Sequence, residues 1–177
     1  RTGELPVPYP PTTMNSPHPD PFSLADEAAA ALAERTGQAT HDAVVVLGSG
    51  WAATADGLGE VLADVPLDDL PGFPAPTVAG HRNSALSVAV GDTTTLVLGG
   101  RSHLYEGHPV PTVVHGVRTA IAAGCGVAIL TNAAGGLNPA WPVGQPVVLR
   151  DQLNLTGASP MAGPPPPPDR PARFVDL

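Results

Sequence analysis

The sequence predicts an α/β protein in which helices flank a mixed, mostly parallel sheet. Two observations support this fold class. Short β-branched runs alternate along the chain with segments whose apolar residues recur at helical spacing. In addition, three of the apolar runs lead directly into polar segments rich in glycine, which is typical of buried strands that end in a loop.

Proline is concentrated near the two ends of the chain. Of the 23 prolines, seven lie in residues 1–22 and seven in residues 160–171. Residues 1–22 are expected to form a flexible extension, because they bury too little apolar surface to offset the entropy of ordering. Residues 23–177 are assigned to one domain, since this length suits a single core. The pentaproline at residues 164–168 predicts a stiff polyproline II connector.

The first predicted helix covers residues 24–35, LADEAAAALAER. Ser23 precedes it and Asp26 follows three positions later, which is close to the capping box that satisfies free amide groups at a helix start. Gly37 ends the helix. The β-branched run at residues 43–47 then predicts a buried strand that stops at a glycine-rich turn.

The middle of the chain predicts a hairpin between two helical segments. A brief helical piece is expected within residues 52–62. The runs Ser84–Val90 and Thr93–Leu98 are separated only by Gly91-Asp92, which predicts two antiparallel strands and a tight turn. Residues 110–123 carry apolar side chains at helical spacing and predict a helix.

Two more strands are expected after this helix. Residues 126–130 form an apolar run that leads straight into the sequence TNAAGG, and residues 147–151 predict a final strand. The chain contains no internal repeat that would indicate a solenoid or a propeller.

Composition excludes several classes of function. The net charge is −8 and all eight cationic residues are arginine, so the chain lacks the clustered positive charge of a nucleic-acid-binding protein. The single cysteine, Cys125, excludes an intramolecular disulfide framework and a cysteine-based zinc site. No apolar stretch reaches the roughly 20 residues of a membrane helix. We therefore expect a soluble, cytoplasmic protein with no nucleic-acid or membrane partner.

Three predicted strands share a polar, glycine-rich loop at their carboxyl ends. The loops begin within the sequences VVVLGSG, TLVLGGRSHLYEG and VAILTNAAGG. In open α/β sheets, ligands bind in the crevice outside the carboxyl ends of the strands. The three loops are therefore expected to converge on one site.

The first loop offers Ser49 between two glycines. A hydroxyl beside several unencumbered backbone amides suits an anion. The turn lacks the lysine of a phosphate-binding P-loop and the three-glycine spacing of a dinucleotide fingerprint. An ordinary strand-ending turn is the alternative interpretation.

The second loop contains Arg101, His103 and Tyr105. If the chain stays extended, these side chains lie on the same face, because side chains alternate along a strand. Arginine supplies a bidentate donor for phosphate, histidine another donor or acceptor, and tyrosine a flat surface with a hydroxyl. The alternative is a solvated edge on which Arg101 is merely paired with Glu106.

His81 and Asn132 lie in two further small-residue turns. His81 follows Gly80 just before a predicted strand, and a structural histidine is the alternative there. Asn132 follows a strand, and residues 133–136 leave room for a ligand to approach the backbone; a turn without a ligand is the alternative. The histidines with no partner pattern are assigned no function, and their spacing indicates no metal site: His18, His41, His108 and His115.

Taken together, these segments resemble the trimeric, low-molecular-mass purine nucleoside phosphorylases. The GRxHxYEG and TNAAGG segments are the specific ones, and they lie about 30 residues apart. The resemblance covers roughly residues 23–177 and rests on six pieces in the family's order: Leu47-Gly48-Ser49-Gly50, Phe73-Pro74 before Thr77-Val78, Gly80-His81, Gly100-Arg101-Ser102-His103-Leu104-Tyr105-Glu106-Gly107, Thr131-Asn132-Ala133-Ala134-Gly135-Gly136-Leu137-Asn138, and Asp151 to Leu155.

The resemblance implies phosphorolysis of purine nucleosides to the free base and (deoxy)ribose 1-phosphate, with phosphate as co-substrate and no cofactor or metal. It implies a nucleoside phosphorylase-like fold and a homotrimer. Tyr105 would contact the ribose, and Glu106 would steady the histidine and phosphate region. The implied catalytic residues are His81, His103 and Glu106, the implied phosphate ligands are Ser49, His81, Arg101, His103 and Ala133, and the implied pocket lining is Asn132, Ala133, Ala134 and Gly135.

The chain also departs from the family pattern. Gln152 stands where the family has a histidine, and residues 156–163 lack the aromatic residue that reaches a neighbouring subunit. Family members continue for about 100 residues, and those residues carry the groups that grip the purine. The chain is therefore expected to be an incomplete, C-terminally truncated phosphorylase domain, and its start at Arg1 without a methionine agrees with a fragment.

Two rival functions stay open. One is a catalytically inactive remnant of the same family that binds phosphate or joins other subunits. The other is methylthioadenosine phosphorylase, which the GRxHxYEG and TNAAGG segments disfavour. The purine preference is left open as well.

Overall fold

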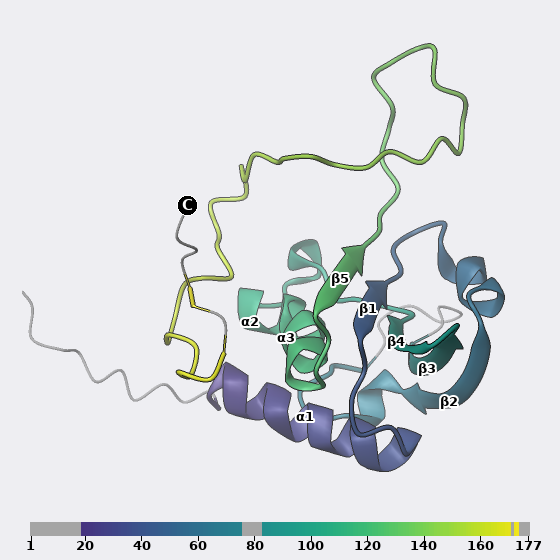
Figure 1. The fold of residues 1–177 in the computed structure, drawn as a ribbon. Helices are drawn as coiled ribbons and strands as arrows, with labels where there is room; N and C mark the ends of the chain where they lie inside the picture. The colour runs from purple at the N-terminus through teal and green to yellow at the C-terminus, as the bar shows by residue number, and fades with distance from the viewer. Residues whose placement is uncertain (1–18, 76–82, 171, 174–177) are drawn as a thin grey trace, which may run out of the picture.

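A computed structural model describes residues 19–75, 83–170 and 172–173 of the chain. Within these ranges, five strands form one sheet in the order β2-β3-β4-β1-β5 (Figure 1). Helices α1 and α3 pack against each other beneath this sheet. The elements along the chain are α1 (Pro21–Thr36), β1 (Ala43–Val46), η1 (Ala52–Gly57), β2 (Glu60–Pro66), η2 (Leu67–Asp69), β3 (Ser84–Val90), β4 (Thr93–Leu98), η3 (Leu104–Glu106), α2 (Val110–Val113), α3 (His115–Ala122) and β5 (Val127–Leu130).

The sheet is mixed, as predicted. Strand β1 lies between β4 and β5 and is parallel to both, while β3 is antiparallel to β2 and to β4. The β3–β4 pair is the predicted hairpin, and Gly91 turns it with a φ of 58°, a value that favours glycine. The parallel part of the sheet is therefore β4-β1-β5, the three strands whose loops were expected to converge.

Helix α1 confirms the first predicted helix but begins earlier, at Pro21. Its N-cap is Asp20, not Ser23: the Asp20 carboxylate accepts hydrogen bonds from the Ser23 backbone N–H at 2.9 Å and from the Ser23 hydroxyl at 3.0 Å. Proline is tolerated in the first turn because its missing N–H would have no helical partner there. Gly37 ends the helix with a φ of 69°.

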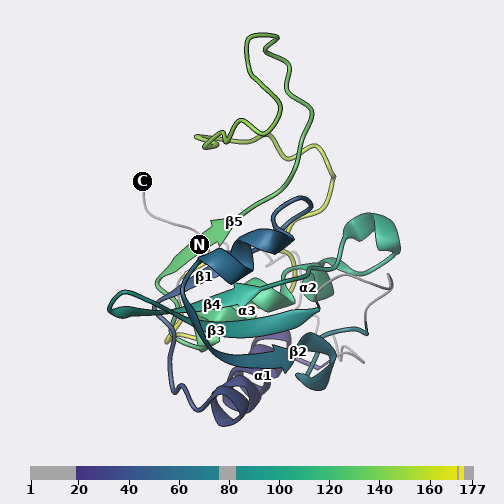
Figure 2. The same ribbon diagram turned by 90° about the vertical axis from the view of Figure 1, so that its right-hand side faces the viewer.

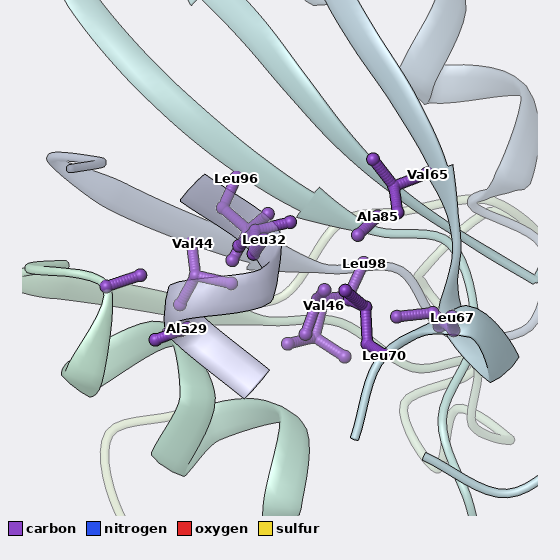
Figure 3. Packing of buried hydrophobic residues seen from close by; sticks show 12 residues of the cluster. Ala29, Leu32, Val44, Val46, Val65, Leu67, Leu70, Ala85, Leu96 and Leu98 are labelled. Atoms are coloured by element: carbon purple, nitrogen blue, oxygen red, sulfur yellow. The ribbon is translucent and has the colours of Figure 1, made fainter. Parts of the chain in front are cut away.

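Apolar side chains pack on both faces of the sheet. The larger cluster lies between the sheet and helices α1 and α3 (Figure 3). The smaller cluster covers the opposite face beneath η1. The larger cluster contains Ala29, Leu32, Val44, Val46, Val65, Leu67, Leu70, Ala85, Leu96, Leu98, Ala120 and Ala123, and the smaller contains Leu47, Ala55, Leu86, Val88 and Val97. This two-sided packing holds β1 and β4 rigidly under the loops that follow them.

Three predicted elements differ from the structure. The helical piece expected in residues 52–62 is limited to η1, and the edge strand β2 follows it. The helix expected at residues 110–123 is divided into α2 and α3, because Val114 leaves helical geometry with φ −96° and ψ 2°. Residues 147–151 form no strand: they are exposed and pair with no strand of the described chain, and a strand without a ladder partner is not stable.

The chain after β5 leaves the sheet. Residues 131–170 are irregular and largely exposed. Both views show this segment extending away from the sheet (Figures 1 and 2), and Figure 1 shows it returning towards α1. It is attached on return by the Arg170–Asp26 ion pair and by Arg118, whose Nη2 donates to the Pro160 carbonyl at 3.0 Å. No helix within the described ranges has the length and apolar character needed to cross a membrane.

Candidate functional site

The three glycine-rich loops begin side by side, as the sequence predicts. Val46 at the end of β1 is in register with Leu98 of β4 and with Leu130 of β5. Because these strands are parallel, the loops starting at Gly48, Gly99 and Thr131 leave the same edge of the sheet. This edge is the candidate functional site.

Thr131 connects the three loops through hydrogen bonds. Its Oγ1 accepts from the Gly48 backbone N–H at 2.9 Å and donates to the Val46 carbonyl at 3.0 Å. Its own carbonyl accepts from Nη1 of Arg101 at 3.2 Å. One residue at the end of β5 thus contacts both the turn after β1 and the arginine after β4.

The turn after β1 requires glycine. A Cβ atom on Gly48 would lie 2.2 Å from the Thr131 carbonyl oxygen and 2.5 Å from Arg101 Nη1. Gly50 has a φ of 84°, a conformation that side-chain-bearing residues rarely adopt. The turn is closed by a bond from the Trp51 N–H to the Gly48 carbonyl at 3.1 Å, and it leaves Ser49 exposed. A hydroxyl and backbone amides are therefore accessible at this edge.

His103 and Glu106 form a local pair in the second loop. Oε2 of Glu106 accepts from the His103 backbone N–H at 2.7 Å and lies 3.0 Å from Nδ1 of the ring. When Nδ1 carries the proton that faces Glu106, Nε2 is the ring nitrogen left for a ligand. The contact orients the imidazole relative to the backbone of the loop.

The second loop is not extended beyond His103, which corrects the expected alternation. The chain turns into the short helix η3 at residues 104–106, and this turn is closed by Gly107 with a φ of 86°. The rings of His103 and Tyr105 nevertheless stack, with centroids 4.6 Å apart and planes at 23°. Tyr105 is 82% exposed, so it is accessible to a ligand on its outer side.

The remaining predicted site residues either follow Thr131 along its loop or lie outside the described residues. Asn132, Ala133, Ala134 and Gly135 follow Thr131 at the same edge and are exposed, and Nδ2 of Asn132 donates to the Ala133 carbonyl at 3.2 Å. His81 lies outside the described residues. The structure thus gathers the start of each loop and leaves the site open to solvent.

Two histidines that were assigned no function are buried in the structure. His41 is 2% exposed, with Nε2 3.0 Å from the Ser87 hydroxyl. His115 is 3% exposed, and its Nε2 donates to the Pro71 carbonyl at 2.8 Å. Burial lowers the pKa of both below the ordinary histidine value. Neither histidine lies at the loop edge, so we interpret both as structural residues of the core.

A metal centre was not expected. In the parts of the chain that the structure describes, no group of three or more histidine, cysteine or acidic side chains is arranged to hold a metal ion. The groups at the loop edge are instead a serine hydroxyl, backbone amides, a guanidinium and an imidazole. These are donors that bind an oxyanion such as phosphate. Arg101 has five N–H donors, so its bond to Thr131 leaves others for a ligand.

Sequence reasoning missed Thr131 as a residue of the candidate site. It was part of the TNAAGG segment, but only Asn132 and its successors were singled out. The available signal was a hydroxyl residue at the end of a strand that neighbours a glycine turn. The sequence alone does not show which strands are neighbours, so the contact could not be predicted.

Comparisons with known proteins identify the family of this chain. The sequence profile of the Phosphorylase superfamily matches residues 42–176. The chain is 51% identical over 175 residues to a purine nucleoside phosphorylase of Cellulomonas sp, covering 95% of this chain and 59% of that protein. It is 50% identical over 164 residues to the purine nucleoside phosphorylase of Mycobacterium tuberculosis, covering 93% of this chain and 58% of that protein.

A solved structure shows the same fold over part of its length. Isoform 2 of purine nucleoside phosphorylase from Schistosoma mansoni, in complex with cytosine and ribose-1-phosphate, superimposes with a TM-score of 0.59 at 29% identity, covering 67% of this chain and 41% of that chain. The chain thus spans somewhat less than three fifths of the length of the curated relatives quoted above. With the profile match extending over residues 42–176, the chain belongs to the phosphorylase superfamily.

Proposed function

We propose that this chain is the phosphate- and ribose-binding part of a purine nucleoside phosphorylase. The enzyme's reaction transfers the pentosyl group of a purine nucleoside to phosphate, releasing the free base and (deoxy)ribose 1-phosphate. The observation that carries the proposal is the convergence of the turn at Gly48, Arg101 and the end of β5 on Thr131. The similarity to purine nucleoside phosphorylases of about 50% identity supports it.

Phosphate is assigned to the donors at the loop edge. Ser49, Arg101 and His103 bind its oxygens, together with the backbone at Ala133, and His81 is proposed as a further ligand. The guanidinium offers paired N–H donors and the serine a hydroxyl, so several oxygens of one phosphate are bound at once. Glu106 acts through its contact with His103.

The nucleoside is assigned to the outer side of the same edge. Tyr105 presents an exposed ring beside His103 and is proposed to contact the ribose. Asn132, Ala134 and Gly135 line the sugar and base side. This places the ribose between phosphate and the open side of the site.

In the proposed reaction, one phosphate anion has two roles. The bond between C1′ of the ribose and the purine nitrogen breaks as a phosphate oxygen bonds to C1′, and the electron pair leaves with the purine, which takes up a proton. The transition state carries positive charge on the sugar. A phosphate anion fixed next to that charge is both nucleophile and electrostatic stabiliser. The role of Arg101 and His103 is to fix the anion in position before the reaction begins.

A second candidate is a remnant that binds phosphate without turnover. The exposure of Tyr105 and of apolar side chains after β5, such as Leu137 at 99%, supports it, because transfer of the pentosyl group to phosphate and not to water requires a site that excludes water. A homotrimer is proposed from the family resemblance, and a cytoplasmic location from the composition.

Two measurements on the 177-residue protein separate these candidates. Calorimetric titration with inorganic phosphate reports binding, and release of hypoxanthine from inosine reports turnover. Binding with turnover supports the phosphorylase, and binding without turnover supports the remnant. No phosphate binding contradicts both.

The matched variants are Arg101→Ala and Arg35→Ala. Replacing Arg101 is expected to weaken phosphate binding at least tenfold, because a charge-assisted bidentate contact is lost. Arg35 lies on α1 and pairs with Asp69 of η2, outside the three glycine-rich loops, in an exposed ion pair that contributes little to stability. Its replacement is expected to leave phosphate binding unchanged.

A further inference from the structure

We propose that Thr131 is a positioning residue for Arg101. Its hydroxyl accepts the hydrogen bond of the Gly48 N–H, which leaves the Thr131 carbonyl available to bind and orient the Arg101 guanidinium. The inference rests on the proposed phosphate site and goes beyond it, because Thr131 itself is not assigned as a phosphate ligand. The effect follows from how the pairing of β1 and β5 ends. Four hydrogen bonds around one residue carry the argument.

The parallel ladder is regular up to Thr131. Val46 pairs with Leu130, and the Thr131 N–H donates to the Val46 carbonyl at 3.0 Å. In a regular parallel ladder, bonds alternate evenly between the strands. The next bond would therefore run from the Gly48 N–H to the carbonyl of Thr131.

The structure replaces that bond. The Gly48 N–H instead donates to the hydroxyl of Thr131 at 2.9 Å, and the hydroxyl donates a hydrogen bond to the Val46 carbonyl at 3.0 Å. The Thr131 carbonyl is released from the ladder and accepts from Arg101 Nη1 at 3.2 Å. The hydroxyl thus satisfies the glycine amide, and the carbonyl holds the guanidinium.

The space at Gly48 explains why both bonds fit. An added Cβ there would lie 2.2 Å from the Thr131 carbonyl oxygen and 2.5 Å from Arg101 Nη1, so the backbone of the turn after β1 passes directly beside the carbonyl–guanidinium contact. Without the hydroxyl, the Gly48 N–H has the Thr131 carbonyl as its nearest replacement acceptor. Arg101 then competes with a backbone amide for the same oxygen and loses its fixed orientation.

Substitutions of Thr131 that keep or remove its hydroxyl are expected to differ in phosphate affinity. Thr131→Val keeps the shape of the side chain and removes the hydroxyl, so phosphate affinity is expected to fall about tenfold. Thr131→Ser keeps the hydroxyl and is expected to retain affinity within about twofold. Thr119→Val on α3 is the matched control, since the Thr119 hydroxyl is buried and has no hydrogen-bond partner among the described residues.

The experiment titrates inorganic phosphate into the 177-residue protein by calorimetry, for the wild type, the three threonine variants, Arg101→Ala and the Thr131→Val/Arg101→Ala double variant. If the hydroxyl acts through Arg101, the double variant binds no more weakly than Arg101→Ala alone. Additive losses, or wild-type affinity in Thr131→Val, overturn the inference. Circular dichroism confirms that each variant is folded.

A second readout is independent of phosphate. The side-chain Nε–H signal of Arg101 and the amide exchange rate of Gly48 are followed by nuclear magnetic resonance in the wild type and in Thr131→Val. An ordered Arg101 signal that broadens or moves in Thr131→Val, and recovers in Thr131→Ser, supports the inference. An Arg101 signal that is the same in all variants overturns it. If the wild type binds no phosphate, the proposed function fails while this readout still decides the role of Thr131.

Discussion

Glu106 binds both the backbone and the ring of His103. A single oxygen, Oε2, accepts from the His103 N–H at 2.7 Å and lies 3.0 Å from its Nδ1. The pair spans the first turn of η3, whose backbone is closed by a bond from the Glu106 N–H to the His103 carbonyl at 3.2 Å. The carboxylate therefore fixes the ring relative to the main chain.

Glu106→Gln is expected to weaken the phosphate site without unfolding the protein. The amide oxygen can still accept from the His103 N–H, but the negative charge beside the imidazole is lost. We expect phosphate affinity, or kcat/KM for phosphate where turnover is found, to change about tenfold. Phosphate titration at fixed inosine measures it. Glu34→Gln, on α1 away from the loop edge, serves as the control; equal effects in the two variants contradict the role of Glu106.

Gly48→Ala is expected to disrupt both stability and binding. The added methyl group would lie 2.2 Å from a backbone oxygen, which cannot move without displacing β5. Overpacking of this kind costs about 2 kcal/mol. Urea unfolding followed by circular dichroism measures the free energy of unfolding, and phosphate titration measures the site.

Gly57→Ala is the matched control for that variant. An added Cβ at Gly57 would meet nothing within 4 Å, and no left-handed φ is required there. Its free energy of unfolding is expected to stay within about 0.5 kcal/mol of the wild type. If both alanine variants are equally stable, the close approach at Gly48 is not the constraint that the structure indicates.

Cys125 is expected to react slowly with thiol reagents in the folded protein. Burial, with the nearby charge of Asp42, raises its pKa to about 11. Only about one thiol in a thousand is then ionised at pH 8, and the thiolate is the reactive form. Absorbance with a disulfide reagent measures the rate before and after addition of urea. A native rate equal to the unfolded rate contradicts the burial of this thiol.

Much of the fold could be predicted from local sequence. The strands β1, β3, β4 and β5 follow from β-branched runs with glycine turns, and α1 follows from its composition and from Gly37. Strand β2 was missed because its exposed side chains, including Val61 and Leu62, give no buried pattern. It is an edge strand that becomes a strand through its pairing with β3, a contact that local sequence does not contain.

The strand predicted at residues 147–151 does not form, because a suitable sequence there lacks a pairing partner in the described chain. Its apolar content is suitable for a strand, but Val148 is 95% exposed and no described strand pairs with it. The side chains of the edge strand β5 are also exposed, including Ile129 at 51%, so this end of the sheet has little cover among the described residues. Sequence pattern gives the tendency to form a strand, and the partner decides whether it forms.

The candidate site, like the fold, could be predicted only in part from local sequence. Ser49, Arg101 and His103 were predicted because their residue types suit an anion and follow strands, whereas the role of Glu106 was implied by the family resemblance. Their relative placement came from the sheet order β4-β1-β5, which makes Thr131 the neighbour of both Gly48 and Arg101. The expectation of one alternating face was wrong because η3 begins directly after His103.

Acid is expected to destabilise the protein through His41 and His115. Both side chains are almost fully buried, and burial lowers the pKa of each below the ordinary value of about 6.5. Below that value the unfolded chain binds protons that the folded chain does not, so the free energy of unfolding falls as the pH falls. Above about pH 7.5 both states hold neutral histidine, and this contribution is constant.

Urea unfolding between pH 5.5 and pH 8 measures this effect, with His41→Gln as the test variant. The glutamine can still contact the Ser87 hydroxyl, which lies 3.0 Å from Nε2 of His41, but it does not titrate. We expect the wild type to lose stability steadily below about pH 6.5 and His41→Gln to lose less over the same range. Because the comparison uses the slope with pH and not the absolute stability, it is valid even if the variant is less stable at pH 8. Equal slopes in the two proteins would show that His41 takes up no proton on unfolding and would leave His115 as the source of any remaining dependence.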